Sequence, residues 1–439
     1  METPSTPIDS SNDNRMLIKW TLSIFLFGLV VFGATFAERL ARHSPDNHYV
    51  YMADGFLHGR LHLEGAPPHR NDWAKYDDKW YVSFPPAPAV LMMPGVFIFG
   101  MSFNDRIFTL FFAAAGPALL FLVLMLLRRR GSIHRTPHEL ALLSAVFGVG
   151  TVYYFAAVQG SVWYTAHMVG TTLMLLFMLA ALDATHPILA GLALGAAFAC
   201  RPPMLLAAPF FVFELLRPHF GDSPKGLFSS IPGALKQIGM KKTLLELICF
   251  IVPIAAILGM MMAMNAARFD DPFEFGHKHL QVRWTGRILK WGLFHYHYLA
   301  HNLAVALTLL PWLSAKPPYL QISLHGLAIW FTTPMLLYIL WPKKRDRFYV
   351  ALAVTAACVA APSLLYQNSG WIQFGYRFAL DYMPYLMVML AASGRRFGKF
   401  FIALFVFAVA VNLFGAVTFD RIRMFYPGGR AAMELFQPN

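Results

Sequence analysis

The chain has 439 residues, of which 57% are hydrophobic and only 13% charged, and its formal net charge is +13 at pH 7. Soluble domains contain about 25% charged residues, so this composition excludes a soluble globular protein and indicates an integral membrane protein. The positive charge does not indicate a nucleic-acid partner, because basic residues cluster in short loops between apolar runs, as in 128–135 and 343–347. We expect the lipid bilayer as a partner, and no nucleic acid.

The apolar runs predict an all-α polytopic membrane protein. Residues 1–15 are polar and are expected to form a disordered cytoplasmic N-terminus. Residues 16–439 are expected to form a single transmembrane domain with about 11–13 helices, since runs of about 20 apolar residues recur throughout. The predicted spans are 16–36, 107–127, 140–158, 167–182, 188–200, 203–217, 243–264, 326–341, 348–366, 382–393 and 400–417.

One apolar segment, 86–103, leaves the number of crossings open. Its prolines and glycines, Pro94 and Gly95 among them, make a poor continuous helix. A re-entrant or surface-lying element is the favoured interpretation. The alternative is that 86–103 crosses the membrane. A second additional crossing, by the apolar stretch 299–315, would then return the rest of the chain to its expected side.

The basic clusters set the expected orientation in the plasma (inner) membrane. With the N-terminus in the cytoplasm, every strong basic cluster falls on the cytoplasmic side. Two large loops, about 37–85 and about 265–325, then lie on the extracytoplasmic face, with the turn 367–381 and the C-terminal tail. The second loop is too long for an ordinary connection, and its Trp, Tyr and apolar residues predict helices in the membrane interface.

The first outer loop concentrates ionisable residues, which makes it the leading candidate for a functional site. Asp46 follows Ser44 and Pro45, and its simplest structural role is to cap a helix N-terminus. Asp54 lies about two helical turns further on, so it shares a face with Asp46 if this stretch is helical; a solvated surface carboxylate is an equal alternative. Asp72, together with Asp77 and Asp78, is expected in a turn or hairpin.

Cysteine and histidine spacing predicts neither a disulfide nor a defined metal site. The three cysteines lie in apolar segments and form no spaced pair. His297 and His301 are four residues apart, yet no Glu lies between them as in a zinc-protease helix. Interfacial histidines without a metal are therefore favoured, and no residue is assigned as a metal ligand.

Several motifs occur in a fixed order along the chain. Asp46–Ala53 (DNHYVYMA) opens the first outer loop, followed by Phe84–Pro88 (FPPAP) and then by Arg106 before the next helix. Weaker motifs follow at 161–167, 200–203, 265–269 and 375–381. This order resembles the GT-C superfamily of polyprenyl-phosphate-sugar-dependent glycosyltransferases, in particular the branch of protein O-mannosyltransferases and lipid A aminoarabinose transferases. Asn47 departs from the pattern, which usually has Asp-Glu at the first two positions.

The resemblance implies a hexosyl- or pentosyltransferase. Such an enzyme moves a sugar from a polyprenyl-phosphate donor to a glycan, lipid or protein acceptor on the extracytoplasmic face. The resemblance places the catalytic base at Asp46. We expect His48, Asp54 and Asp72 to support this base on the acceptor side. No cofactor follows from the resemblance, and because family members differ in metal dependence, a divalent metal stays open.

Arginines are the expected ligands of the donor phosphate, because the guanidinium fork matches phosphate oxygens and stays charged. Arg377 resembles the arginine that some family members direct at the lipid phosphate. Arg201, between two apolar segments, needs a partner or a ligand, and Arg268 and Arg60 are further candidates. For Arg377 and Arg201 the alternative is a side chain that snorkels to the membrane interface.

Two other function classes stay open. A transporter or lipid-linked-sugar flippase would place ionisable residues in broken helices near the bilayer midplane, often with internal repeats. Here the ionisable residues cluster in outer loops and no repeat relates the two halves. A non-enzymatic relative is the third class, because Asn47 replaces the second acid of the motif.

Overall fold

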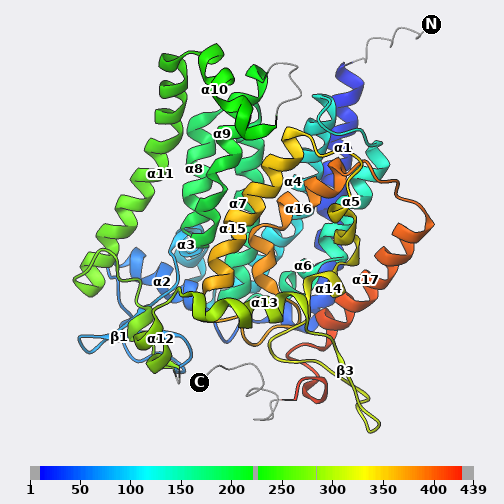
Figure 1. The fold of residues 1–439 in the computed structure, drawn as a ribbon. Coiled ribbons are helices and arrows are strands. Elements are labelled where there is room, and N and C mark those ends of the chain that lie inside the picture. The colour runs from blue at the N-terminus through cyan, green and yellow to red at the C-terminus, as the bar shows by residue number, and fades with distance from the viewer. Residues whose placement is uncertain (1–9, 221–225, 283, 428–439) are drawn as a thin grey trace, which may run out of the picture.

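The computed structural model describes residues 10–220, 226–282 and 284–427. They form a predominantly helical bundle (Figure 1), so the predicted all-α class is confirmed. Six helices are long and apolar enough to cross a membrane. They are α1 (Ser10–Phe36), α4 (Asp105–Arg129), α7 (Val162–Ala181), α11 (Met240–Phe269), α15 (Arg347–Leu365) and α17 (Lys399–Thr418). Helix α1 begins within the segment predicted to be disordered, of which residues 1–9 lie outside the described part of the chain.

Six such helices among the described residues are fewer than the predicted eleven to thirteen, because several apolar runs are broken. The predicted span 140–158 is two helices, α5 (Pro137–Val149) and α6 (Val152–Ala157). The predicted span 326–341 divides into the short α14 (Ile329–Thr332) and a 3-10 helix that begins at Pro334. Proline lacks an amide hydrogen and restricts the residue before it, so the α-helix ends there.

The segment 86–103 contains α3 (Ala87–Phe99), a helix of 13 residues. At 1.5 Å per residue it is about 20 Å long, which is short of the roughly 30 Å hydrocarbon core. This length agrees with the re-entrant or surface-lying interpretation. In the stretch 299–315 the helix α13 (Leu299–Leu307) is shorter still. The other helices are α2 (His48–Leu57), α8 (Pro187–Phe198), α9 (Ala208–Leu216), α10 (Leu227–Ile238), α12 (Thr285–Trp291) and α16 (Met383–Ala392).

Helices α1, α4, α7, α8 and α11 pack successively against one another, and α15 packs on α9 and α16. Glycines allow the closest of these approaches. A Cβ at Gly191 of α8 would collide with the Phe250 carbonyl oxygen of α11, and one at Gly195 would meet Ile257. The spacing Gly191–Gly195 puts both on one face, the small-residue arrangement that lets membrane helices approach closely.

The two outer loops gather at one end of the bundle, opposite the N-terminus of α1 and α10 (Figure 1). The first loop carries α2 and a hairpin of β1 (Trp73–Tyr76) and β2 (Lys79–Val82). Asp77 and Asp78 form its two-residue turn with φ of 46° and 54°, which is the backbone of a type I′ turn, so the predicted hairpin is confirmed. The second loop carries α12, α13 and a short hairpin of β3 (Trp312–Leu313) and β4 (Leu320–Gln321). Helix α11 extends to Phe269, so Arg268 lies in its last turn rather than in the loop.

Candidate functional site

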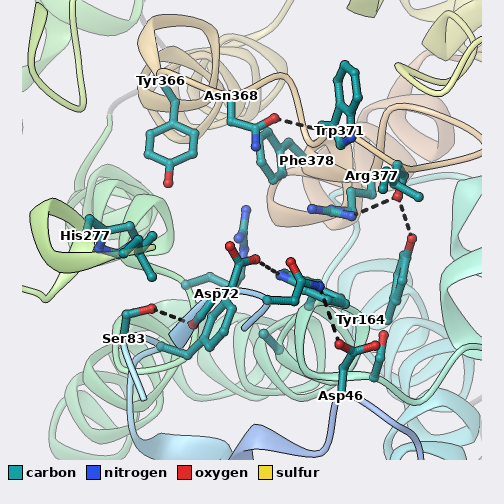
Figure 2. A pocket seen from close by; sticks show the side chains of 18 of the residues that line it. Asp46, Asp72, Ser83, Tyr164, His277, Tyr366, Asn368, Trp371, Arg377 and Phe378 are labelled. Atoms are coloured by element: carbon teal, nitrogen blue, oxygen red, sulfur yellow. Dashed lines mark hydrogen bonds between the residues drawn. The ribbon is translucent and has the colours of Figure 1, made fainter. Parts of the chain in front are cut away.

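A cavity of about 1710 Å³ lies among the loops at this end of the bundle. Its walls come from segments far apart in sequence, namely 44–46, 70–72, 161–166, 200–203, 275–287 and 362–378. Figure 2 shows Asp46 and Asp72 on one side of the space and Asn368, Arg377 and Phe378 across from them. Asp46 and Arg377, which are far apart in sequence, therefore line one cavity.

Asp46 lies on the cavity wall just before α2, and it does not cap that helix. The N-cap is Asn47, which makes no side-chain capping bond. The Asp46 carboxylate instead accepts a long hydrogen bond from the Asn71 amide, at 3.5 Å, and lies 3.4 Å from the His69 ring. Burial raises its pKa above the ordinary value of 3.8, while His69 and Asn71 oppose the rise. A carboxylate with few partners on a cavity wall is suited to accept a proton from a bound hydroxyl.

Asp72 is the second carboxylate of the cavity. Its backbone is in the left-handed region with φ of 56°, immediately before β1. The carboxylate accepts a 2.9 Å hydrogen bond from the Trp163 indole, which fixes its orientation. Burial raises the pKa of Asp72, while Trp163 and Arg377 oppose the rise. Asp46 and Asp72 thus belong to two different segments of the first outer loop.

Arg377 is buried on the facing wall, with 7% of its surface exposed. It opens the 3-10 helix η9 (Arg377–Asp381), and its guanidinium lies over the Tyr164 ring at 5.3 Å. The side chain donates only a long bond, 3.4 Å, to the Ile372 carbonyl, and its buried Nε has no hydrogen-bond partner among the described residues. No carboxylate in the described part of the chain forms an ion pair with it. A desolvated cation without an anion is costly, so this position favours an anionic ligand.

Arg201 also lines the cavity, but it is already paired. Its guanidinium donates two bonds, at 3.0 and 2.8 Å, to Asp381, whose side chain is fully buried. The His167 ring lies 3.2 Å from the same carboxylate. Burial alone would raise the pKa of Asp381, but Arg201 and His167 outweigh it and hold the pKa at about 2. This pair therefore persists at acidic pH values at which a solvated aspartate would protonate.

Replacing Asp381 by Asn is expected to lower the free energy of unfolding by about 3 kcal/mol, because Arg201 then loses its buried counter-charge. The matched control is Asp420→Asn, which breaks the 2.6 Å pair with Arg39 at an aspartate that is 63% exposed. Exposed pairs contribute about 0–1 kcal/mol, so this variant should remain near wild type. Denaturant unfolding of both variants in one detergent provides the comparison, and equal losses would contradict the assignment.

Three residues at the start of α4 hold the chain that leads to Asp46. The Asp105 carboxylate accepts the Ser44 amide at 2.7 Å and the Ser44 hydroxyl at 2.5 Å. Asn104 donates to the Leu40 carbonyl at 2.7 Å, and Arg106 donates to the carbonyls of residues 39 and 42. Asp105 and Ser44 are both buried, so the segment before Asp46 is fixed from three sides.

Asp105→Ala is expected to cost about 1.5–3 kcal/mol, the range for hydrogen bonds to a charged group, and to loosen this segment locally. Amide hydrogen exchange should accelerate at residues 40–47 more than elsewhere. Ser102→Ala is the matched control, because the Ser102 hydroxyl is exposed and donates only to the Phe99 carbonyl. Exchange that is unchanged in Asp105→Ala would rule out this role.

Four predicted site residues do not line the cavity. Asp54 and Arg60 pair with each other at 3.4 Å, and Asp46 precedes α2 rather than sharing a helix face with Asp54. His48 is buried and stacks on Trp73 at 4.0 Å, and burial lowers its pKa to about 4. Arg268 donates to the Val82 carbonyl at 2.8 Å and joins α11 to the hairpin. These residues support the first outer loop instead of facing the cavity, which corrects the placement expected from sequence.

The histidines of the second outer loop lie among aromatic rings. His297 stacks on Trp291 at 4.5 Å, and His279 stacks on Phe269 at 5.5 Å. Among the described residues, no group of three or more His, Cys, Asp or Glu side chains is arranged to hold a metal ion.

The cavity also contains residues that sequence reasoning did not single out, among them Asn71, Trp163, Tyr164 and Arg287. Trp163 and Tyr164 belong to the weaker motif at 161–167, to whose residues the sequence assigned no role. The Tyr164 hydroxyl donates to the Ile372 carbonyl at 3.0 Å and holds the loop that carries Arg377. No motif in the sequence distinguishes Arg287 from the other basic residues of the second outer loop.

No family model and no curated protein matches the chain. Solved structures do match. The oligosaccharyltransferase of Archaeoglobus fulgidus in the apo form is 15% identical, with a TM-score of 0.40, over 93% of this chain and 56% of that chain. ArnT from Cupriavidus metallidurans bound to undecaprenyl phosphate is 13% identical, with a TM-score of 0.43, over 85% of this chain and 60% of that chain. The chain thus spans less than two thirds of the length of these proteins.

Proposed function

We propose that the protein transfers a sugar from a polyprenyl-phosphate donor to an acceptor on the extracytoplasmic face of the membrane. The observation that carries the proposal is that one cavity is lined both by Asp46 and by the buried Arg377, which forms no ion pair among the described residues. A base and a phosphate ligand are the two groups that this reaction requires. The order of motifs along the sequence supports the same reaction.

In this reaction, the Asp46 carboxylate accepts the proton of the acceptor hydroxyl as its oxygen attacks the anomeric carbon. The bond from that carbon to the phosphate oxygen breaks, and its electron pair stays on the phosphate. The leaving polyprenyl phosphate therefore gains one negative charge, which Arg377 stabilises where it develops. A single displacement of this kind inverts the anomeric carbon.

Asp72 is proposed to act beside Asp46 on the acceptor side. Its carboxylate is fixed by Trp163, so its second oxygen can orient the acceptor hydroxyl toward the base. Arg201 is proposed to contribute its positive charge to the phosphate site while its guanidinium remains bound to Asp381.

A donor panel tests the proposal. Membranes that contain the protein are incubated with polyprenyl phosphates bearing different labelled sugars and with a cell-envelope extract as acceptor. We expect labelled product and free polyprenyl phosphate in equal amounts with at least one donor. Flux of lipid-linked sugar across proteoliposomes without any transfer would support a transporter or flippase instead.

A further inference from the structure

The cavity wall carries more positive charge than a donor phosphate requires. Six arginines and three aspartates line it, and neither Lys nor Glu does so among the described residues. The arginines are Arg39, Arg70, Arg106, Arg201, Arg287 and Arg377. Three of them are satisfied within the protein, since Arg39 and Arg201 pair with aspartates and Arg106 binds backbone carbonyls. Arg377 is accounted for by the proposed donor phosphate.

Two lining arginines remain, of which Arg70 is exposed and Arg287 is half-buried. The Arg287 guanidinium donates to the neutral side chain of Gln367 at 3.3 Å, and its buried Nε has no partner among the described residues. The Tyr298 hydroxyl donates to the Arg287 carbonyl at 3.4 Å, and the Gln367 backbone N–H donates to the Leu293 carbonyl at 2.9 Å. The two backbone bonds fix α12 against the segment that follows α15, and the bond to Gln367 holds the guanidinium itself.

Arg287 and Arg377 hold opposite ends of one cavity loop. Arg287 bonds the loop at Gln367, and Arg377 bonds it at Ile372. Trp371 and Asn368 of this loop also line the cavity. Behind Arg287, a small cavity of about 20 Å³ is lined by His301 and His325. Burial lowers the pKa of both histidines to about 4, so at neutral pH they add no charge and Arg287 is the cation at this position.

We propose that Arg287 binds a second anionic group, and that this group belongs to the acceptor. The acceptor is then an oxyanion-bearing molecule, such as a glycan or lipid substituted with phosphate or carboxylate. A neutral acceptor would leave the Arg287 charge partly desolvated and without a counter-ion once substrate fills the cavity. The planar guanidinium fork matches both kinds of oxyanion. The inference rests on the proposed function for the meaning of acceptor, but a second anion site is testable without any transfer reaction.

The test measures two anions binding at once to the full-length protein in phosphatidylcholine nanodiscs. Undecaprenyl phosphate probes the donor site, while glucose 6-phosphate, glucuronate and glucose probe the second site. We expect glucose 6-phosphate and glucuronate to bind about 10- to 100-fold more tightly than glucose, as hydrogen bonds to a charged group imply. Saturating undecaprenyl phosphate should leave this binding intact.

Arg287→Gln should remove the preference for the anionic sugars and leave undecaprenyl phosphate binding unchanged, which also verifies that the variant is folded. Lys290→Gln is the matched control, because Lys290 is an exposed cation of the same helix outside the cavity. Anionic sugars that bind no better than glucose, or that undecaprenyl phosphate displaces, would overturn the proposal. So would weaker binding of undecaprenyl phosphate in Arg287→Gln, because the second anion would then belong to the donor. Failure of undecaprenyl phosphate to bind at Arg377 would instead count against the proposed function.

Discussion

Replacement of Asp46 by Asn is expected to lower the kcat of sugar transfer by about 10²- to 10⁴-fold, the usual contribution of a positioned general base. Asparagine has nearly the same size but cannot accept the hydroxyl proton. The carboxylate contacts only His69 and Asn71, both at long distance, so the fold should survive the change. Donor affinity, measured with undecaprenyl phosphate, should remain near wild type. Steady-state kinetics with the best donor of the panel provide the measurement.

The pH profile gives the same assignment an independent readout. Only the ionised carboxylate can act as a base, so activity should fall as pH decreases through the pKa of Asp46. Because burial raises that pKa above 3.8, the acid limb of kcat/KM should lie at higher pH than for a solvated aspartate. The residual activity of Asp46→Asn should lack this limb.

Asp54→Asn is the matched control for Asp46. The two carboxylates belong to the same outer loop, but Asp54 faces Arg60 and His58 and does not line the cavity. We expect less than about a threefold change in kcat, since the half-buried Asp54 carboxylate lies outside the cavity and cannot reach the substrate. Equal losses in the two variants, or full activity in Asp46→Asn, would exclude Asp46 as the base.

The local features of the first outer loop could be predicted from sequence because they depend on neighbouring residues. Asp77 and Asp78 between two short strand patterns indicate a tight turn, and the structure has it. The number of long helices could not be obtained in this way. Apolar composition measures the length of a run, but it does not show that a helix ends near Gly150 or at Pro334.

The composition of the cavity depends on contacts between distant segments, for which one sequence carries no signal. Arg201 and Asp381 are 180 residues apart, and their pairing decides that Arg201 is not a free phosphate ligand. The arginine motifs alone cannot distinguish Arg377, which has no anionic partner among the described residues, from Arg268, which donates to a hairpin carbonyl. Sequence therefore provided the candidates, and burial with hydrogen bonding ranked them.

Replacement of Arg377 by Gln is expected to weaken binding of undecaprenyl phosphate by about 10²- to 10³-fold, which corresponds to two charge-assisted hydrogen bonds. Glutamine retains some hydrogen-bonding capacity but loses the charge that the phosphate requires. The affinity of Arg377→Lys for undecaprenyl phosphate should lie between those of the wild type and Arg377→Gln, because an ammonium restores the charge without the planar fork. Binding is measured in nanodiscs by titration of the lipid, with the folded fraction checked by thermal unfolding.

Arg268→Gln is the control that distinguishes a loss of ligand affinity from a loss of protein stability. Arg268 is as buried as Arg377, but it donates to the Val82 carbonyl and Asn265 and lies outside the cavity. Its removal should lower the unfolding temperature, because buried acceptors lose their donor, while the affinity of the folded protein for undecaprenyl phosphate remains unchanged. If Arg377→Gln behaves in the same way, with reduced stability and normal affinity, then Arg377 is a structural residue and the donor phosphate binds elsewhere in the cavity.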